Sequence, residues 1–332
     1  MKSWLFRQFP QTIPLVVSAV VGLGGALSAN PAWAGDPFRI TNAEAIGTHT
    51  EAAFKALFQA GDYPTAAQEL ALAAQEEGSE PLIYAMEASI AYLQEDWPGV
   101  RSYAEKTFAA GQALLTTSPV RGHLYMAIGH LMEGAYVLSP QGEGSLKGLP
   151  TALGKLQQAY GSLSQAKTIN AVDPELNLVQ GFMELMIALY LPLANPDQAM
   201  TQLETYAAPT YLADWGRAVG FRDLDRYAEG FNAVDRAMKD STNPQLYYLR
   251  AQLWVRQGIA QKDAANFIQA QTDFRRALAR SSQLPKRLVA QIFREYCRNQ
   301  IRIDGADRDC GALRQPILTT EGNWGPETLP SL

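Results

Sequence analysis

A glycine-rich segment, Leu138–Pro150, is the part of the sequence that comes nearest to phosphate chemistry. It reads LSPQGEGSLKGLP, and the backbone amides of such a loop can cradle an anion where a helix begins. The spacing argues against a nucleotide-binding loop, because Gly148 rather than Ser or Thr follows Lys147 and no strand pattern precedes the segment. We therefore expect an exposed loop that contributes Lys147 to partner contacts.

Histidines and aspartates supply the other candidates for catalysis or metal binding. Two of the three histidines, His123 and His130, are further apart than the i, i+4 spacing that lets two side chains of one helix share a metal. The stretch DGADRDC near the carboxyl end carries aspartates, but not in the order of a calcium loop. We expect no catalytic residue, metal or cofactor from these patterns, although carboxylates of distant helices could still converge. The residues concerned are His49, His123, His130, Asp304, Asp307 and Asp309.

The clearest charge pattern is a basic carboxyl-terminal helix predicted over Lys286–Ile303. Its arginines separate from an apolar stripe that should face inward. They are Arg287, Arg294, Arg298 and Arg302. A solvated outer face that caps the molecule is one interpretation, and an anion-binding surface is the other. The anionic partner would be an acidic protein, an anionic lipid surface or an acidic wall polymer.

Charge is also distributed unevenly along the chain, whose formal net charge is −5. Residues 35–216 contain 8 Lys and Arg against 20 Asp and Glu, whereas residues 217–332 contain 18 against 13. Head-to-tail contact between two copies would follow from this asymmetry, and salt would weaken it. Because the chain is acidic and predicted to be exported, we do not expect nucleic acid as a partner.

The amino-terminal residues 1–34 are typical of a secretory signal peptide. Lys2 and Arg7 precede an apolar stretch, Ile13–Ala29, and PAWAG follows, so that cleavage would leave Gly35 as the new amino terminus. An uncleaved membrane anchor is the alternative. The pattern predicts export, most simply to the periplasm, with no stable membrane span after cleavage. In an oxidising compartment, Cys297 and Cys310 are expected to form a disulfide that stabilises the fold by about 3 kcal/mol.

Helical periodicity runs from Thr50 to Arg302, and sustained two-residue alternation is absent, so the sequence predicts an all-α protein. Its breaks contain Pro, Asn and Asp, which end one helix and cap the next. Two of these breaks, QAGDYP and LQEDWP, are related by a step of 34 residues. The equivalent pairs are Asp62 and Asp96, Tyr63 and Trp97, and Pro64 and Pro98.

With this period, the chain resembles the tetratricopeptide-repeat (TPR) family. Ala88 and Ala251 occupy the small position of the first helix, and Gly258 is expected at a turn that IAQKDAANF lengthens. Phe274 and Ala277 occupy the large and small packing positions of the second helix. In the first repeat, Phe54 occupies the position that is expected to be small. The resemblance implies an α–α superhelix of about six helix pairs plus the closing helix, over residues 49–303. An extended linker, 35–48, would precede it and a disulfide-tethered tail, 304–332, would follow.

TPR proteins bind peptides in a concave groove lined by the first helix of each pair. The lysine and asparagine clamp of one well-known version is missing at the corresponding positions, such as Tyr248 and Gln252. Aromatic residues could line the groove instead, although aromatics at helical spacing also build cores. The predicted partner-binding residues of the groove are Tyr84, Tyr92, Tyr248, Gln252 and Trp254.

The expected function is therefore that of an exported, non-catalytic interaction or assembly scaffold of the cell envelope, with a protein or peptide partner. One alternative is an envelope enzyme, or its accessory subunit, acting on wall glycan through a carboxylate that the sequence does not identify. A deep pocket with two facing carboxylates would favour it. A second alternative is a self-associating structural protein.

Overall fold

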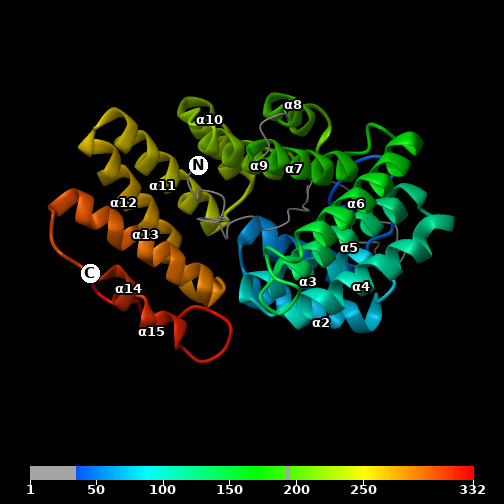
Figure 1. Ribbon diagram of the computed structural model, residues 1–332, viewed down its shortest axis with the longest axis horizontal. Coiled ribbons are helices and arrows are strands. Elements are labelled where there is room, and N and C mark those ends of the chain that lie inside the picture. Colours follow the sequence, from blue (N-terminus) through cyan, green and yellow to red (C-terminus); the bar gives the residue numbers. More distant parts are fainter. Residues whose placement is uncertain (1–34, 191–194) are drawn as a thin grey trace, which may run out of the picture.

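The computed structural model describes residues 35–190 and 195–332, and within these ranges the regular elements are all helices (Figure 1). Six helix pairs follow one another along the chain. The first three pairs are α1 (Thr48–Phe54) with α2 (Tyr63–Glu76), α3 (Pro81–Gln94) with α4 (Trp97–Ala113), and α5 (Pro119–Leu138) with α6 (Leu149–Ile169). The last three are α7 (Pro174–Tyr190) with α8 (Pro196–Tyr206), α9 (Thr210–Asp223) with α10 (Tyr227–Asp240), and α11 (Pro244–Gln261) with α12 (Ala264–Leu278). The π-helix η1 (Lys55–Ala60) continues α1, and the 3-10 turn η2 (Leu114–Thr116) follows α4.

A closing helix completes this array. The 3-10 turn η3 (Ser281–Gln283) leads into α13 (Lys286–Asp304), and two short helices follow, α14 (Cys310–Leu313) and α15 (Gln315–Leu318). Neighbouring helices pack on one another around a continuous apolar core, as in a solenoid. The predicted all-α fold of six helix pairs and a closing helix is confirmed.

The corners inside three of the pairs share one backbone design. The first helix of each ends in a left-handed residue: Gly61 (φ 70°), Glu95 (φ 58°) or Lys262 (φ 56°). An aspartate comes next and accepts a hydrogen bond from a free amide at the start of the second helix. These aspartates are Asp62, Asp96 and Asp263. Only the first corner has the glycine that this conformation favours.

The last pair differs from its predicted form. Residues 259–267, expected to lengthen the turn, instead extend α11 through Gln261 and begin α12 at Ala264. Gly258 therefore lies inside α11, where an added Cβ would be 2.8 Å from Cε1 of Phe267 on α12. The glycine permits close approach of two helices and does not form the turn. The other predicted packing residues, Ala88, Ala251, Phe274 and Ala277, are buried.

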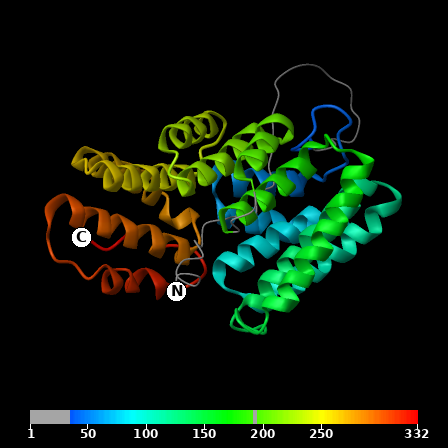
Figure 2. The same cartoon turned by 45° about the horizontal axis from the view of Figure 1, so that its top comes forward.

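The first pair is enclosed by later elements rather than exposed at one end of the array. Backbone carbonyls at the end of η1, which no residue of that helix can satisfy, accept hydrogen bonds from the α10–α11 loop. Gln59 O accepts from Thr242 N and Ser241 Oγ, both at 2.9 Å, and Phe58 O accepts from Asn243 Nδ2 at 3.1 Å. In Figures 1 and 2 the blue helical segment accordingly lies between the yellow and orange helices α11–α13 and the cyan and green helices α3–α6.

Residues 35–47 do not form the extended linker that the sequence predicts. Phe38 and Ile46 are buried in the core, and Phe38 contacts Phe54 with their ring centroids 5.5 Å apart. Arg39 forms ion pairs with Asp173 and Glu175, beside the start of α7. The segment therefore packs against the helical core without forming a helix itself. The predicted signal peptide, 1–34, lies outside the described residues.

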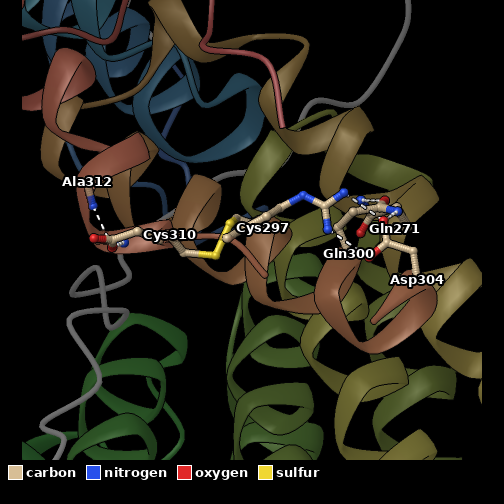
Figure 3. Close-up of a disulfide and its surroundings, with 9 residues drawn as sticks. Gln271, Cys297, Gln300, Asp304, Cys310 and Ala312 are labelled. Atoms are coloured by element: carbon tan, nitrogen blue, oxygen red, sulfur yellow. Dashed lines mark hydrogen bonds and ion pairs between the residues drawn. A yellow bond between two sulfur atoms is a disulfide. The ribbon is translucent and has the colours of Figure 1, made fainter. Parts of the chain in front are cut away.

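The carboxyl-terminal segment folds back on α13. Cys297 and Cys310 form a disulfide with their Cα atoms 5.7 Å apart, as predicted (Figure 3). Beyond it Ile317 is buried, and Lys286 N donates to Asn323 O at 3.0 Å. No helix in the described ranges is both long and apolar enough to cross a membrane.

Candidate functional site

A cleft lies where the closing helix meets the second helix pair, and we call it the α3–α13 cleft. It is a shallow depression that is open to solvent. Its walls come from segments far apart in the chain, the corner between α3 and α4 and the first two turns of α13. The lining residues are Tyr92, Leu93, Glu95, Trp97, Arg287, Leu288 and Gln291.

Local structure at the α3–α4 corner positions one wall. Glu95 takes the left-handed conformation that ends α3, and Asp96 caps α4 so that Trp97 begins it. The rings of Tyr92 and Trp97 meet edge to face with their centroids 5.5 Å apart. Arg287 crosses from α13 to the Glu95 carboxylate at 2.8 Å. The cleft therefore offers aromatic edges beside a guanidinium that is 44% exposed.

A chain of hydrogen bonds leads from Gln291, in the wall of the cleft, into the interior. Gln291 Nε2 donates to the Tyr248 hydroxyl at 3.1 Å, and that hydroxyl donates to Glu295 at 2.8 Å. Gln252 Nε2 also donates to Glu295, at 3.0 Å, and Gln252 Oε1 accepts from Arg222 at 2.5 Å. Each polar group of this chain is thus held in one orientation by its neighbours.

The Tyr248 hydroxyl acts only as a protonated group in this arrangement. Burial and the adjacent Glu295 carboxylate raise its pKa well above the usual value. It therefore donates to Glu295 and accepts from Gln291 at any ordinary pH. The chain makes a rigid polar backing, and the described residues of the cleft supply one carboxylate, Glu95, which already pairs with Arg287.

A second cluster of charges is buried between the amino-terminal segment and helices α3, α5 and α7. Arg121 bonds Glu80 at 2.7 Å and Glu175 at 3.1 Å, and Arg39 bonds Glu175 at 2.8 Å. Tyr125 donates to Glu175 at 2.5 Å. Glu175 is fully buried and its pKa is lowered, since the two arginines and Tyr125 outweigh the effect of burial. With every charge enclosed, this cluster orders the fold and offers no access to a ligand.

The predicted basic face of α13 contains a distinct group of cations. Arg294, Arg298 and Arg302 follow one another at four-residue intervals, and Arg314 between α14 and α15 is close enough for its charge to interact with Arg294 and Arg298. Among the described residues, none of these four arginines makes a hydrogen bond or an ion pair. Arg287, at the start of the same helix, belongs instead to the cleft.

Three of the predicted partner-binding residues lie elsewhere. Tyr84 donates to Gly78 O at 2.8 Å and lies under Lys106. Trp254 packs on Phe231 with their ring centroids 4.1 Å apart, which joins α11 to α10. Lys147 is exposed in the turns between α5 and α6, as expected for that loop. The structure therefore brings Tyr92 and Arg287 together, with Tyr248 and Gln252 behind them.

Two of the histidines and two of the carboxyl-terminal aspartates have local partners. His130 packs on Phe108, and His49 is 2.7 Å from Glu69. Asp304 pairs with Arg308 at 2.7 Å, and Asp309 caps α14. In the ranges that the structure describes, no group of three or more His, Cys, Asp or Glu residues is arranged to hold a metal ion.

Several residues of these sites escaped the sequence reasoning, among them Glu95, Trp97, Gln291 and Arg314. Trp97 occupies the same repeat position as Tyr63. Tyr63 is buried against Gln245, whereas Trp97 lines the cleft, and only tertiary contacts decide this difference. The predicted disulfide could have indicated that Arg314 lies near the basic face of α13, because it ties the tail to that helix. Comparison with protein-family models, curated proteins and solved structures gives no match to this chain.

Proposed function

We propose that the protein is an exported, non-catalytic interaction or assembly scaffold of TPR type in the cell envelope, most simply in the periplasm. It binds a segment of a protein partner at the α3–α13 cleft. The observation that carries this proposal is the meeting of Tyr92, Trp97 and Arg287 in an open cleft backed by a rigid polar chain. Aromatic and arginine side chains are the residues that most often dominate protein interfaces.

The form of the cleft favours binding over catalysis. It is open to solvent, and its single carboxylate is engaged by Arg287, whereas acid–base hydrolysis of a glycan needs two carboxyl groups facing one substrate. A peptide that carries an apolar side chain could place it against Trp97 and direct a carboxylate or carbonyl oxygen toward Arg287. The Arg287 guanidinium keeps hydrogen-bond donors available because Glu95 occupies only part of it.

Site-specific photocrosslinking in cells tests the proposal. A photoreactive side chain at Trp97 should crosslink a discrete partner, and the same group at Gln158, exposed on α6, provides the matched control. Adding Arg287→Ala should reduce the yield from position 97 several-fold. Equal yields from both positions, or a crosslinked product that contains only this chain, would reject a partner-binding cleft, and the second result would favour self-association.

A further inference from the structure

Four arginines of α13 and the tail, which have no hydrogen bond or ion pair within the described residues, form a separate site. We propose that Arg294, Arg298, Arg302 and Arg314 bind a doubly charged phosphate group, and that the Cys297–Cys310 disulfide assembles this site. The inference specifies the chemistry of the anionic partner that the sequence predicts for the basic helix. It is independent of the α3–α13 cleft. We call these residues the arginine site.

The spacing along α13 and the disulfide bring the four arginines to one region of the molecule. Arg294, Arg298 and Arg302 recur every four residues along α13, so they share one helix face with a rise of about 6 Å between neighbours. Arg314 approaches them from the junction of α14 and α15. Cys297 immediately precedes Arg298, and its partner Cys310 begins the short helix that leads to Arg314. The disulfide thus ties together the two backbones that carry the site.

Three carboxylates near this surface, those of Glu295, Asp304 and Asp309, already have hydrogen-bond donors. Glu295 accepts from Tyr248 and Gln252 on the side of α13 that faces α11. Asp304 forms two bonds of 2.7 Å to Arg308, and Asp309 accepts the backbone amides of Gly311 and Ala312. Within the described residues these arginines form no ion pair, unlike neighbouring cations such as Arg250 and Arg308.

The positive charges of these arginines repel one another. Burial and the charges of Arg294 and Arg298 lower the pKa of Arg314. Burial and Arg298 lower the pKa of Arg302 more than the charge of Glu295 raises it. Arg314 Nε is buried without a hydrogen-bond partner among the described residues. A bound oxyanion would relieve the repulsion and satisfy such a donor.

Phosphate suits this site better than a carboxylate. Several guanidinium groups meet there, and each presents a planar pair of donors that matches two phosphate oxygens. A phosphate group near neutral pH carries close to two negative charges and three acceptor oxygens, enough to engage more than one arginine. A soluble phosphate compound or the headgroup of a phosphate-bearing lipid could supply this chemistry.

Titration calorimetry with the purified, oxidised protein tests the site with inorganic phosphate as the probe. Sodium phosphate is compared with sodium acetate at equal ionic strength, and phosphatidic acid vesicles with phosphatidylcholine vesicles. We expect saturable phosphate binding that acetate does not reproduce. Arg298→Gln and Arg314→Gln should each weaken it at least ten-fold. Arg276→Gln, an exposed arginine paired with Asp273, should leave it unchanged.

Removal of the disulfide separates an assembled site from mere positive charge. Cys297→Ala combined with Cys310→Ala should weaken phosphate binding at least ten-fold, while circular dichroism shows an unchanged helix content. Binding to phosphatidic acid vesicles that free phosphate displaces would support the site with a lipid as the source. The proposal fails if neither phosphate nor these vesicles bind, or if the arginine and cysteine variants bind like wild type. Arg287→Ala should not affect phosphate binding. Failure of the cleft proposal can therefore be distinguished from failure of the arginine site.

Discussion

Arg287, near the start of α13, reaches the carboxylate of Glu95, the residue that ends α3, at a distance of 2.8 Å. This ion pair connects the closing helix to the second helix pair and forms one edge of the α3–α13 cleft. Because both side chains are partly exposed, it contributes at most about 1 kcal/mol to stability. Its main effect is geometric: it holds Arg287 beside Trp97 in a fixed position.

The left-handed corners predict a stabilising substitution. Lys262 is exposed and takes φ 56° between α11 and α12, a conformation that is costly for a side chain with a Cβ. Lys262→Gly should raise the free energy of unfolding by about 0.5 to 1 kcal/mol, since the relieved strain exceeds the added freedom of the unfolded chain. Urea denaturation monitored by circular dichroism measures the difference.

Glu95→Gly is the matched comparison for that corner. It relieves the same backbone strain at the end of α3 but also removes the partner of Arg287. Its gain in stability should therefore be smaller than that of Lys262→Gly. A loss of stability in Lys262→Gly would show that the left-handed conformation is not costly at these corners.

The buried charge cluster predicts a large loss of stability. Glu175→Gln keeps the shape of the side chain but removes the negative charge that Arg39 and Arg121 share in the protein interior. We expect a decrease of about 3 to 5 kcal/mol in the free energy of unfolding. Glu105→Gln, in an exposed pair with Arg101, should cost less than about 0.5 kcal/mol. Equal effects of the two substitutions would contradict this account.

Local signals account for what the sequence predicted correctly. Asp62 and Asp96, each followed by an aromatic residue and a proline, mark helix starts, and both accept from amides there. Contacts between distant residues could not be predicted in this way. The bond from Asn243 to Phe58 O and the pairing of Arg39 with Asp173 depend on how the whole array curves. No spacing within one helix specifies that curvature, so the enclosed first pair and the packed segment 35–47 were not predicted.

Two histidines predict opposite dependences of stability on pH. Burial and Lys155 lower the pKa of His130, so the unfolded chain takes up the proton first as the pH falls. Stability should therefore decrease below about pH 6.5, the unperturbed histidine pKa. The hydrogen bond to Glu69 raises the pKa of His49, so its contribution is complete below about pH 6.5 and is lost as the pH rises through the folded pKa.

Substitution of each histidine separates these two effects. His130→Gln should flatten the loss of stability below about pH 6.5, whereas His49→Gln should remove the gain of stability that acidification brings above about pH 6.5. Urea denaturation at pH 5, 6, 7 and 8 measures both profiles. Identical pH profiles for wild type and both variants would show that neither histidine changes its proton affinity on folding.

The packing of α11 tests whether the repeat register is correct. Ala251 is fully buried, and Ala260, near the end of the same helix, is exposed. Ala251→Leu should overpack the contact between helices and lower the free energy of unfolding by about 1 to 3 kcal/mol. Ala260→Leu should change it by less than about 0.5 kcal/mol, because an exposed site accommodates the larger side chain. An unchanged melting temperature for Ala251→Leu would mean that another residue makes the close contact, and the TPR register proposed for α11 and α12 would then be wrong.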